Sequence, residues 1–388
     1  MLALTTCVAI ATIFVQNEDG YRLAEIGSLG KGNASAICVA ETGTVVGQTD
    51  SKNGLVGFVW TPSTMKALIS PGLASSAEGI NDVAFSVGWI TFPDGKLRAA
   101  GWRDGQIVQF GTLGGKESQA FAVNNKNVVV GWAHDEIGRR RAFVWFQGDL
   151  AQMTSQLVPM ERVGIRPALP QVAGGGKSEI GSSGGGASSS SSTGNANRTT
   201  MMGIGNECIA YDISDNNLIC GSAQNSNGIW KAFLFKDDMM LDLGIGDLSS
   251  AGKTESNASA SSSSSSTTTV GDPSAAGLSV NSSGVVVGWI EDSKKFRKAV
   301  IWRAPGIIEY VQGLEEAVWS EARGINEDGI LVGCAKLKDG TFRGFVVKNG
   351  MTLLLRSIVV AANDINNRGQ IAVDVQKGNQ VIAGLLVR

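Results

Sequence analysis

Residues 120–132 read AFAVNNKNVVVGW, and residues 142–145 read AFVW. Both motifs recur in one register along the chain. The positions equivalent to Asn124 are Ala40, Asn81, Ser214, Asn281, Asn326 and Asn366. A glycine follows seven residues later in every unit except the last, where Val373 replaces it. The second motif reads GFVW (57–60), AAGW (99–102), AFVW (142–145), AFLF (232–235), AVIW (299–302), GFVV (344–347) and AGLL (383–386). Seven internal repeats therefore decide the fold.

The spacing of the repeats reveals two inserts. Successive reference positions lie 41, 43, 90, 67, 45 and 40 residues apart, so one repeat is about 42 residues long. The two long intervals contain segments rich in Ser and Gly, at 174–200 and in the run of Ser and Thr after 260. Such segments carry too little apolar surface to fold. We expect disordered inserts at about 160–200 and 249–275.

Each repeat has the pattern of four short strands. The first leads into Ile-Asn-x-x-Gly (325–329), where Asn and Gly suit a tight turn that needs positive φ. A β-branched strand, a polar loop, the AFVW strand and a last strand such as Gln106–Phe110 follow. Four strands in about 42 residues is the size of a propeller blade.

The two ends of the chain predict how the ring closes. Repeat seven ends after its third strand, at 386–388, and YRLAEI at 21–26 looks like a fourth strand that has no blade of its own. Pairing the two would remove exposed sheet edges. We therefore predict an all-β, seven-bladed β-propeller over residues 20–388.

The phrase FGTLGGKESQAFAVNNKNVVVGW (110–132) followed by RRRAFVW (139–145) resembles the bacterial HAF-repeat proteins, described as probable extracellular repeat proteins. The resemblance spans residues 21–388 apart from the inserts. The histidine of the family's His-Ala-Phe-Leu-Trp motif is replaced by a basic residue at Arg98, Arg141, Lys231, Lys298 and Arg343. The resemblance implies a secreted or cell-surface location in a bacterium, and it brings no catalytic residues with it.

The first residues allow two interpretations. Residues 1–16 are largely apolar but too short to span a membrane, so 1–19 is a signal- or anchor-derived segment or, alternatively, a buried strand. We expect membrane contact only through residues 1–16, if at all. The net charge of −2 excludes a generally basic nucleic-acid binder. We expect a monomer.

Catalytic and metal-binding patterns are missing from the sequence. It contains one His and five scattered Cys without a CxxC pair, and we expect most of these Cys to be buried as small apolar residues. Paired carboxylates at 135–136, 237–238 and 315–316 stand beside expected turns, as do Asp328 and Asp364. The sequence therefore predicts no enzyme, cofactor or metal site.

Tryptophans occupy two repeat columns. The first contains Trp60, Trp102, Trp145 and Trp302, and the second contains Trp89, Trp132 and Trp289. Repetition in register favours packing between blades over ligand stacking. Trp230 and Trp319 lie outside both columns and are better candidates for exposed contacts.

The loops between the second and third strands carry fifteen basic and eight acidic residues. In a propeller these loops share one face with the connections between blades, which also carry both inserts. We expect this face to bind an anionic partner, either an acidic polysaccharide or an acidic protein surface. The candidate binding residues are Arg98, Arg139, Arg140, Arg141, Lys231, Lys294, Lys295, Arg297, Lys298 and Arg343. The alternative is that these loops are charged because they are hydrated, and that the column from Arg98 to Arg343 pairs with neighbouring blades.

The leading functional hypothesis is a non-enzymatic binding or adhesion module that is extracellular or on the bacterial surface. An intracellular, cytoplasmic scaffold for protein–protein interaction is the alternative, because propellers serve many functions. A propeller enzyme acting on carbohydrate comes third.

Overall fold

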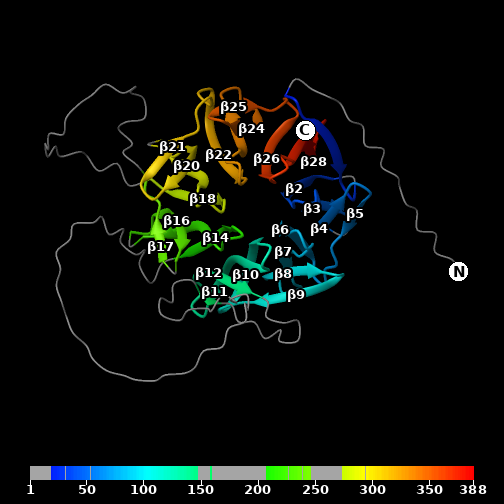
Figure 1. Ribbon diagram of the computed structural model, residues 1–388. Helices are drawn as coiled ribbons and strands as arrows, with labels where there is room; N and C mark the ends of the chain where they lie inside the picture. Colours follow the sequence, from blue (N-terminus) through cyan, green and yellow to red (C-terminus); the bar gives the residue numbers. More distant parts are fainter. Residues whose placement is uncertain are drawn as a thin grey trace, which may run out of the picture.

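A computed structural model describes residues 19–30, 32–52, 54–146, 158–159, 207–225, 227–237, 239–245, 273–292 and 294–388. These residues form seven four-stranded antiparallel sheets arranged around a central axis, as Figure 1 shows. The predicted seven-bladed β-propeller is therefore confirmed. Within these ranges, no helix is long and apolar enough to cross a membrane.

In each of the first three blades, the four strands follow one another in chain order from the axis outward. Blade 1 contains β2 (Ala34–Val39), β3 (Val45–Ser51), β4 (Gly54–Thr61) and β5 (Thr64–Ala67). Blade 2 contains β6 (Ala74–Ile80), β7 (Ser86–Thr91), β8 (Leu97–Arg103) and β9 (Gln106–Gly111). Blade 3 contains β10 (Gly114–Val123), β11 (Val128–Asp135), β12 (Arg140–Phe146) and β13 (Val158–Pro159).

The same order holds in the next three blades. Blade 4 contains β14 (Cys208–Ile213), β15 (Ile219–Gln224), β16 (Trp230–Lys236) and β17 (Met239–Asp242). Blade 5 contains β18 (Ala275–Val280), β19 (Val286–Glu291), β20 (Arg297–Ala304) and β21 (Ile307–Tyr310). Blade 6 contains β22 (Ala317–Ile325), β23 (Leu331–Leu337), β24 (Phe342–Lys348) and β25 (Met351–Leu354).

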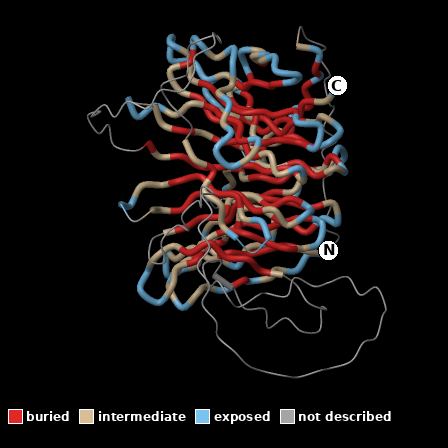
Figure 2. Tube along the Cα trace, turned by 60° about the vertical axis from the view of Figure 1, so that its left-hand side comes forward, coloured by how far each residue is buried: buried red, intermediate tan, exposed pale blue. Residues whose placement is uncertain are grey.

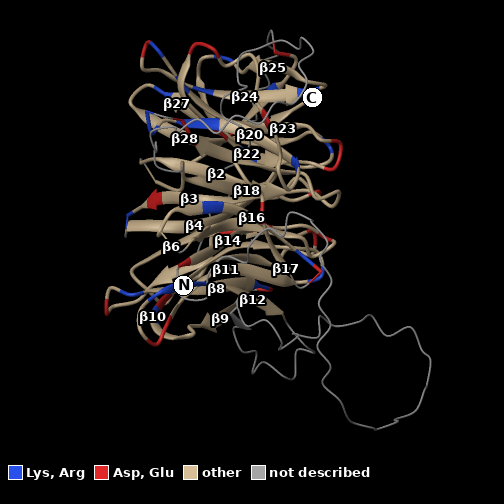
Figure 3. Cartoon of the chain, turned by 90° about the vertical axis from the view of Figure 1, so that its left-hand side faces the viewer, with Lys and Arg blue, Asp and Glu red and all other residues tan. Residues whose placement is uncertain are grey.

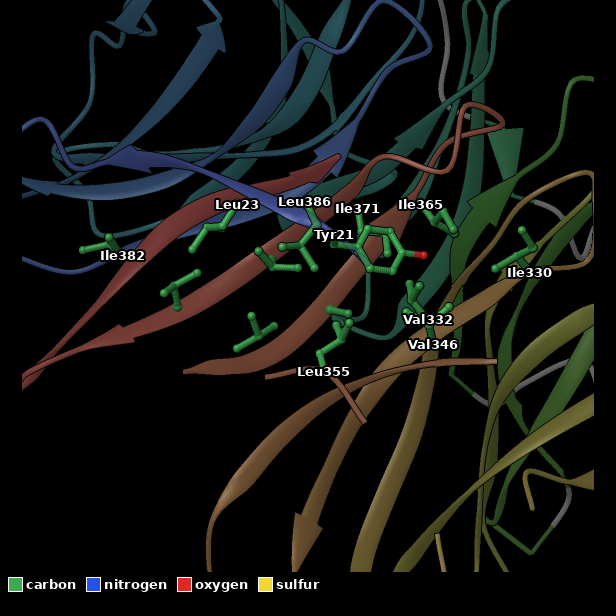
Figure 4. Packing of buried hydrophobic residues seen from close by; sticks show 14 residues of the cluster. Tyr21, Leu23, Ile330, Val332, Val346, Leu355, Ile365, Ile371, Ile382 and Leu386 are labelled. Atoms are coloured by element: carbon green, nitrogen blue, oxygen red, sulfur yellow. The ribbon is translucent and has the colours of Figure 1, made fainter. Parts of the chain in front are cut away.

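Blade 7 closes the ring with strands from both ends of the chain. It contains β26 (Val359–Ile365), β27 (Ile371–Lys377), β28 (Gln380–Val387) and, on the outside, β1 (Arg22–Gly27). Leu23 of β1 pairs with Leu386 of β28, as predicted. Figure 4 shows Tyr21 beside Leu386 and Ile371, next to Val332 and Val346 from blade 6. The closing strand is thus anchored in the core between blades 6 and 7.

Apolar residues between adjacent blades form the core, and Figure 2 shows this buried layer between two exposed faces. The first tryptophan column lies in it: Trp145 packs with Phe85 and Phe110 of blade 2, and Trp302 is fully buried. The indole of Trp302 donates to the carbonyl of Gly244, at 3.1 Å, in the preceding blade. Packing between blades is therefore confirmed for this column. Cys208, Cys220 and Cys334 are buried too, as expected.

The repeated asparagine joins each blade to the next. Asn124 Nδ2 donates to the carbonyl of Ser214 at 3.0 Å, and its Oδ1 accepts from the N–H of Val128 at 3.0 Å within its own turn. Asn81, Asn281, Asn326 and Asn366 make the same pair of contacts. The turn needs positive φ at the fourth residue, as at Gly329 (φ 73°), and not at the asparagine. The predicted reason for this asparagine was therefore wrong.

In six of the seven blades, close packing inside the blade requires the repeated glycine. A Cβ on Gly131 would lie 2.0 Å from the carbonyl oxygen of Gln119, and one on Gly221 would lie 2.0 Å from that of Ile209. Both carbonyls belong to the innermost strand, which bulges at this level. The glycine therefore accompanies the bulge in six blades, whereas blade 7 bulges opposite Val373. The sequence pattern did not reveal the bulge.

Several expectations fall at the edge of the described residues. Residues 1–18 and the segments 160–206 and 246–272 lie outside them, so the nature of 1–19 and of the inserts stays a prediction. Ala275, which the second predicted insert includes, is the first residue of β18. The expectation that Asp364 stands beside a turn was wrong, because this residue lies in strand β26.

Candidate functional site

The propeller has two chemically different faces, seen edge-on in Figure 3, where charged residues gather at both edges. We call the side with the turns between first and second strands the turn face, and the opposite side the loop face. On the loop face, the loop and connection backbones are joined, for example from Gln376 N–H to the carbonyl of Ile358. Loops between second and third strands therefore do share a face with the connections between blades, as predicted.

The predicted basic column is largely engaged in contacts inside the fold. Three of its members donate to backbone carbonyls at the entry to the next blade. These contacts join Lys231 to Pro273, Lys298 to Ala317 at 3.1 Å, and Arg343 to Leu355. In blades 2 and 3 the column pairs inside its own loop, through Arg98 with Asp94 and Arg141 with Asp135. Pairing with neighbouring blades, the alternative interpretation, thus holds for blades 4–6.

The other predicted binding residues flank this column, and most form ion pairs. Arg139 pairs with Asp135 at 3.1 Å, and Lys295 with Glu291 at 3.3 Å. Arg140 pairs with Glu207 at 2.7 Å. Burial opposes ionisation of Asp135, but hydrogen bonds from the backbone N–H of Arg139 and from the Arg141 and Arg139 side chains lower its pKa to about 2.

The remaining two members of the predicted set lie on blade 5, and one of them reaches blade 6. Arg297 pairs with the buried Glu321 at 2.9 Å. Lys294 is exposed on its loop. The ten predicted residues therefore do not converge on one point, but form an arc. Six of them pair with carboxylates, and three donate to backbone carbonyls.

Aromatic rings accompany the basic groups on this arc. The Arg140 guanidinium lies 5.7 Å from the ring centre of Trp230, and that of Arg297 lies 4.0 Å from Trp289. On blade 6, the Lys336 ammonium lies 5.6 Å from Phe342, whose ring stands edge-on to Trp319. Trp230 and Trp319 are half-buried, and Phe342 is 44% exposed. Blades 3–6 thus present three pairs of a cationic and an aromatic side chain.

A cavity of about 450 Å³ occupies the central channel and is lined by the innermost strands of all seven blades. Each of these strands bulges three residues before the reference position. The bulge residues line the cavity and differ from blade to blade. They are Ile37, Glu78, Phe121, Tyr211, Leu278, Arg323 and Asn363.

Three carboxylates lie on the channel wall. Burial raises the pKa of Glu78, whose Oε1 accepts from the indole of Trp89 at 2.8 Å. Burial also raises the pKa values of Asp212 and Asp364, which occupy the same repeat position in blades 4 and 7. Each of them accepts from the next blade, through Val280 N–H and Val39 N–H respectively, both at 2.9 Å. These two groups therefore brace the ring while lining its interior.

A second ring surrounds the mouth of the channel on the turn face, at the residue after each reference position. Backbone N–H groups donate to the side chain of the next blade, as from Glu41 to Asp82 and from Ser282 to Glu327. Asn125 bridges the carboxylates of Asp82 and Asp215 at 2.8 and 2.9 Å. Four of the seven ring residues are acidic. They are Glu41, Asp82, Asp215 and Glu327.

One cation faces this acidic lining. Arg323 donates to Glu321 at 2.8 Å and to Asn363 Oδ1 at 2.6 Å, and Asn363 continues to the carbonyl of Ala36. The neighbouring Glu321 charge raises the pKa of Arg323, although its burial opposes this. Among the described residues, no group of three or more His, Cys, Asp or Glu is placed to hold a metal ion.

The channel residues were missed in the sequence because they interrupt the repeat. The position before the bulge is Ala in six blades and Gly in the other, whereas the bulge position holds a different residue in each. A variable position flanked by repeated ones was the available signal. It marks residues released from packing between blades and turned toward the axis.

No family model matches the chain, and no curated protein matches it in sequence. Its fold is similar to solved propeller structures at low identity. A lectin from Burkholderia pseudomallei, BP39L, is 9% identical, covers 90% of this chain and 94% of its own, and has a TM-score of 0.42. A mutant of Aleuria aurantia lectin in complex with Fucα1-6GlcNAc is 6% identical over 85% and 96% of the two chains, with a TM-score of 0.39. AofleA from Arthrobotrys oligospora is 9% identical over 88% and 92%, with a TM-score of 0.36.

Proposed function

We propose that this protein is a non-enzymatic binding protein of the bacterial surface, and that its loop face binds an anionic polysaccharide. The carrying observation is the arc of cation–aromatic pairs on blades 3–6: Arg140 with Trp230, Arg297 with Trp289, and Lys336 with Phe342. Aromatic rings offer flat apolar surfaces that suit the C–H faces of sugars. Guanidinium and ammonium groups beside them suit carboxylate or sulfate substituents.

The ion pairs of this arc define how such a ligand would bind. Because Arg140 and Arg297 already hold Glu207 and Glu321, an anionic sugar gains little from displacing those partners. Lys294 is exposed, and Lys338 pairs with Glu316 through side chains that are 61% and 74% exposed, a pair that exchanges at little cost. These two lysines are therefore the better electrostatic contacts. We expect stacking to supply the affinity, and the exposed lysines to supply the preference for an anion.

Retention on immobilised polygalacturonate tests this proposal, with dextran as the neutral reference. The charge-reversal variant Lys294→Glu/Lys338→Glu should lose most of its retention, and Phe342→Ala should weaken it severalfold. The matched control is Lys236→Glu/Lys348→Glu, which makes the same charge change at exposed residues on the turn face. Equal retention of the two double variants, or equal binding to dextran, would overturn the proposed site.

The surface location is a separate part of the proposal and rests on the repeat motifs that resemble extracellular repeat proteins. Protease treatment of intact producing cells should release peptides of this chain. Cleavage only after lysis would contradict the surface location and favour the scaffold alternative.

A further inference from the structure

The channel cavity meets the loop-face arc at Glu321, which pairs with Arg297 of the arc and with Arg323 of the cavity lining. The rest of the charged lining is acidic. Glu78, Asp212 and Asp364 line the wall, and Glu41, Asp82, Asp215 and Glu327 surround the mouth on the turn face. The only basic residue in the described lining is Arg323, which shares the carboxylate of Glu321 with Arg297. A concave surface of one sign focuses its field and concentrates mobile ions of the opposite sign. The cavity therefore favours a cationic occupant.

An organic cation fits this lining better than a metal ion does. The mouth carboxylates are spread around a ring of seven blades, and no described group of three or more acidic, His or Cys side chains could hold a metal. Each mouth carboxylate also accepts backbone N–H groups, as Asp82 does from Glu41. An elongated ligand with separated charges can meet such a ring, whereas a compact ion needs several ligands at one point.

The two blades that follow Glu78 carry aromatic rings at the same level of the channel wall. The consecutive blades 2, 3 and 4 have Glu78, Phe121 and Tyr211 as their bulge residues, so these three residues form one continuous stretch of the channel wall. The ring centres of Phe121 and Tyr211 are 5.3 Å apart, with their planes inclined by 45°. Ring faces attract ammonium groups and also accept methylene chains. Arg323 lies in blade 6, away from this stretch of the wall, and its positive charge repels a cation toward the stretch.

The distance between the wall carboxylate Glu78 and the carboxylates around the mouth sets the length of the ligand. Glu78 and Asp82 belong to the same strand and its turn, four residues apart, which corresponds to roughly 10 Å along a bulged strand. We propose that the channel binds a linear aliphatic polyamine that enters from the turn face. One ammonium pairs with Glu78 beside Phe121 and Tyr211, the methylene chain follows the rings, and another ammonium meets the mouth carboxylates.

Calorimetric titration of the full chain with spermidine at low salt tests this site. Binding should be measurable in the micromolar to low millimolar range and should weaken as pH falls, because protonation of Glu78 removes the charge partner. Burial raises the pKa of Glu78, so this loss begins above the usual range of a glutamate. 1,8-Octanediol, a neutral chain of similar length, should not compete, and tetramethylammonium should compete only weakly.

Three variants locate the site. Glu78→Gln should weaken spermidine binding about tenfold, and Phe121→Leu about threefold. Glu316→Gln, which removes an exposed carboxylate on the loop face, should leave it unchanged. Absence of binding, an unchanged affinity in Glu78→Gln, or equal displacement by Mg²⁺ at the same charge concentration would each overturn the proposal. Unfolding curves of all variants verify that they are folded.

Discussion

The two faces of the propeller join the same seven blades by different chemistry. On the turn face, buried asparagine side chains bond to backbone groups of their own turn and of the next blade, in five of the seven repeats. On the loop face, charged side chains pair across half-exposed loops, and the partners change from blade to blade. Arg141 takes Asp135, whereas Arg343 takes the carbonyl of Leu355.

This difference separates closure of the ring from binding. A hydrogen bond from a buried, neutral side-chain amide is not screened by salt, and leaving its groups without partners costs much stability. Repeating this hydrogen bond therefore holds the blades at one angle. Exposed ion pairs contribute little to stability and can be exchanged. The loop face is therefore free to vary its residues for a ligand, while the turn face is not.

We expect the largest loss in the free energy of unfolding from a substitution on the turn face, at Asn124. Asn124→Ala removes two donated bonds and two accepted bonds at a residue that is 3% exposed. Urea unfolding should show a loss of about 2–4 kcal/mol. Asn124→Ser should cost less, because Ser214 still accepts from Leu218 N–H in the equivalent turn. A loss below about 0.5 kcal/mol in Asn124→Ala would remove the distinction between the faces.

On the loop face, Asp135 pairs with both Arg139 and Arg141. Its pKa is lowered to about 2, so its stabilising effect is present above about pH 4 and is lost as pH falls through 2. Asp135→Asn should cost about 1–2 kcal/mol at pH 7, and the difference from the wild type should shrink between pH 4 and 2. The control Asp94→Asn changes a 56% exposed partner of Arg98 and should be nearly neutral. A pH-independent difference would exclude the ion pairs as its cause.

At the channel wall, the effect of pH on stability should have the opposite direction. Burial raises the folded-state pKa of Glu78, so its ionisation costs stability, and this cost appears as pH rises through the raised pKa. Glu78→Gln keeps an acceptor for the Trp89 indole and should be more stable than the wild type at pH 8. The two proteins should converge near pH 4. Thermal unfolding across this range would contradict the interpretation if the variant were less stable at pH 8.

The smallest effect is expected at an exposed pair of the loop face. Lys338 and Glu316 are 3.0 Å apart, with side chains 61% and 74% exposed. Lys338→Ala should change the free energy of unfolding by less than about 0.5 kcal/mol, and added salt should reduce even that. A loss as large as that of Asn124→Ala would show that loop-face pairs also hold the ring.

Local pattern alone determined the architecture of this protein. Seven repeats of about 42 residues predicted seven blades, and Tyr21–Ile26 predicted the closing strand, which the structure places at Arg22–Gly27. The tryptophan column at Trp145 and Trp302 was assigned to packing between blades for the same reason. These features were readable because every blade must solve the same packing problem with the same residues.

Only the tertiary structure decided which charges are balanced and which residues face the axis. Arg140 meets Glu207 and Arg297 meets Glu321 across sequence separations of 67 and 24 residues. The cavity gathers Glu78, Phe121 and Tyr211 from three blades, at a bulge that moves one residue out of the strand alternation. Ring closure brings these positions together, and a repeat pattern carries no information about positions at which its members differ.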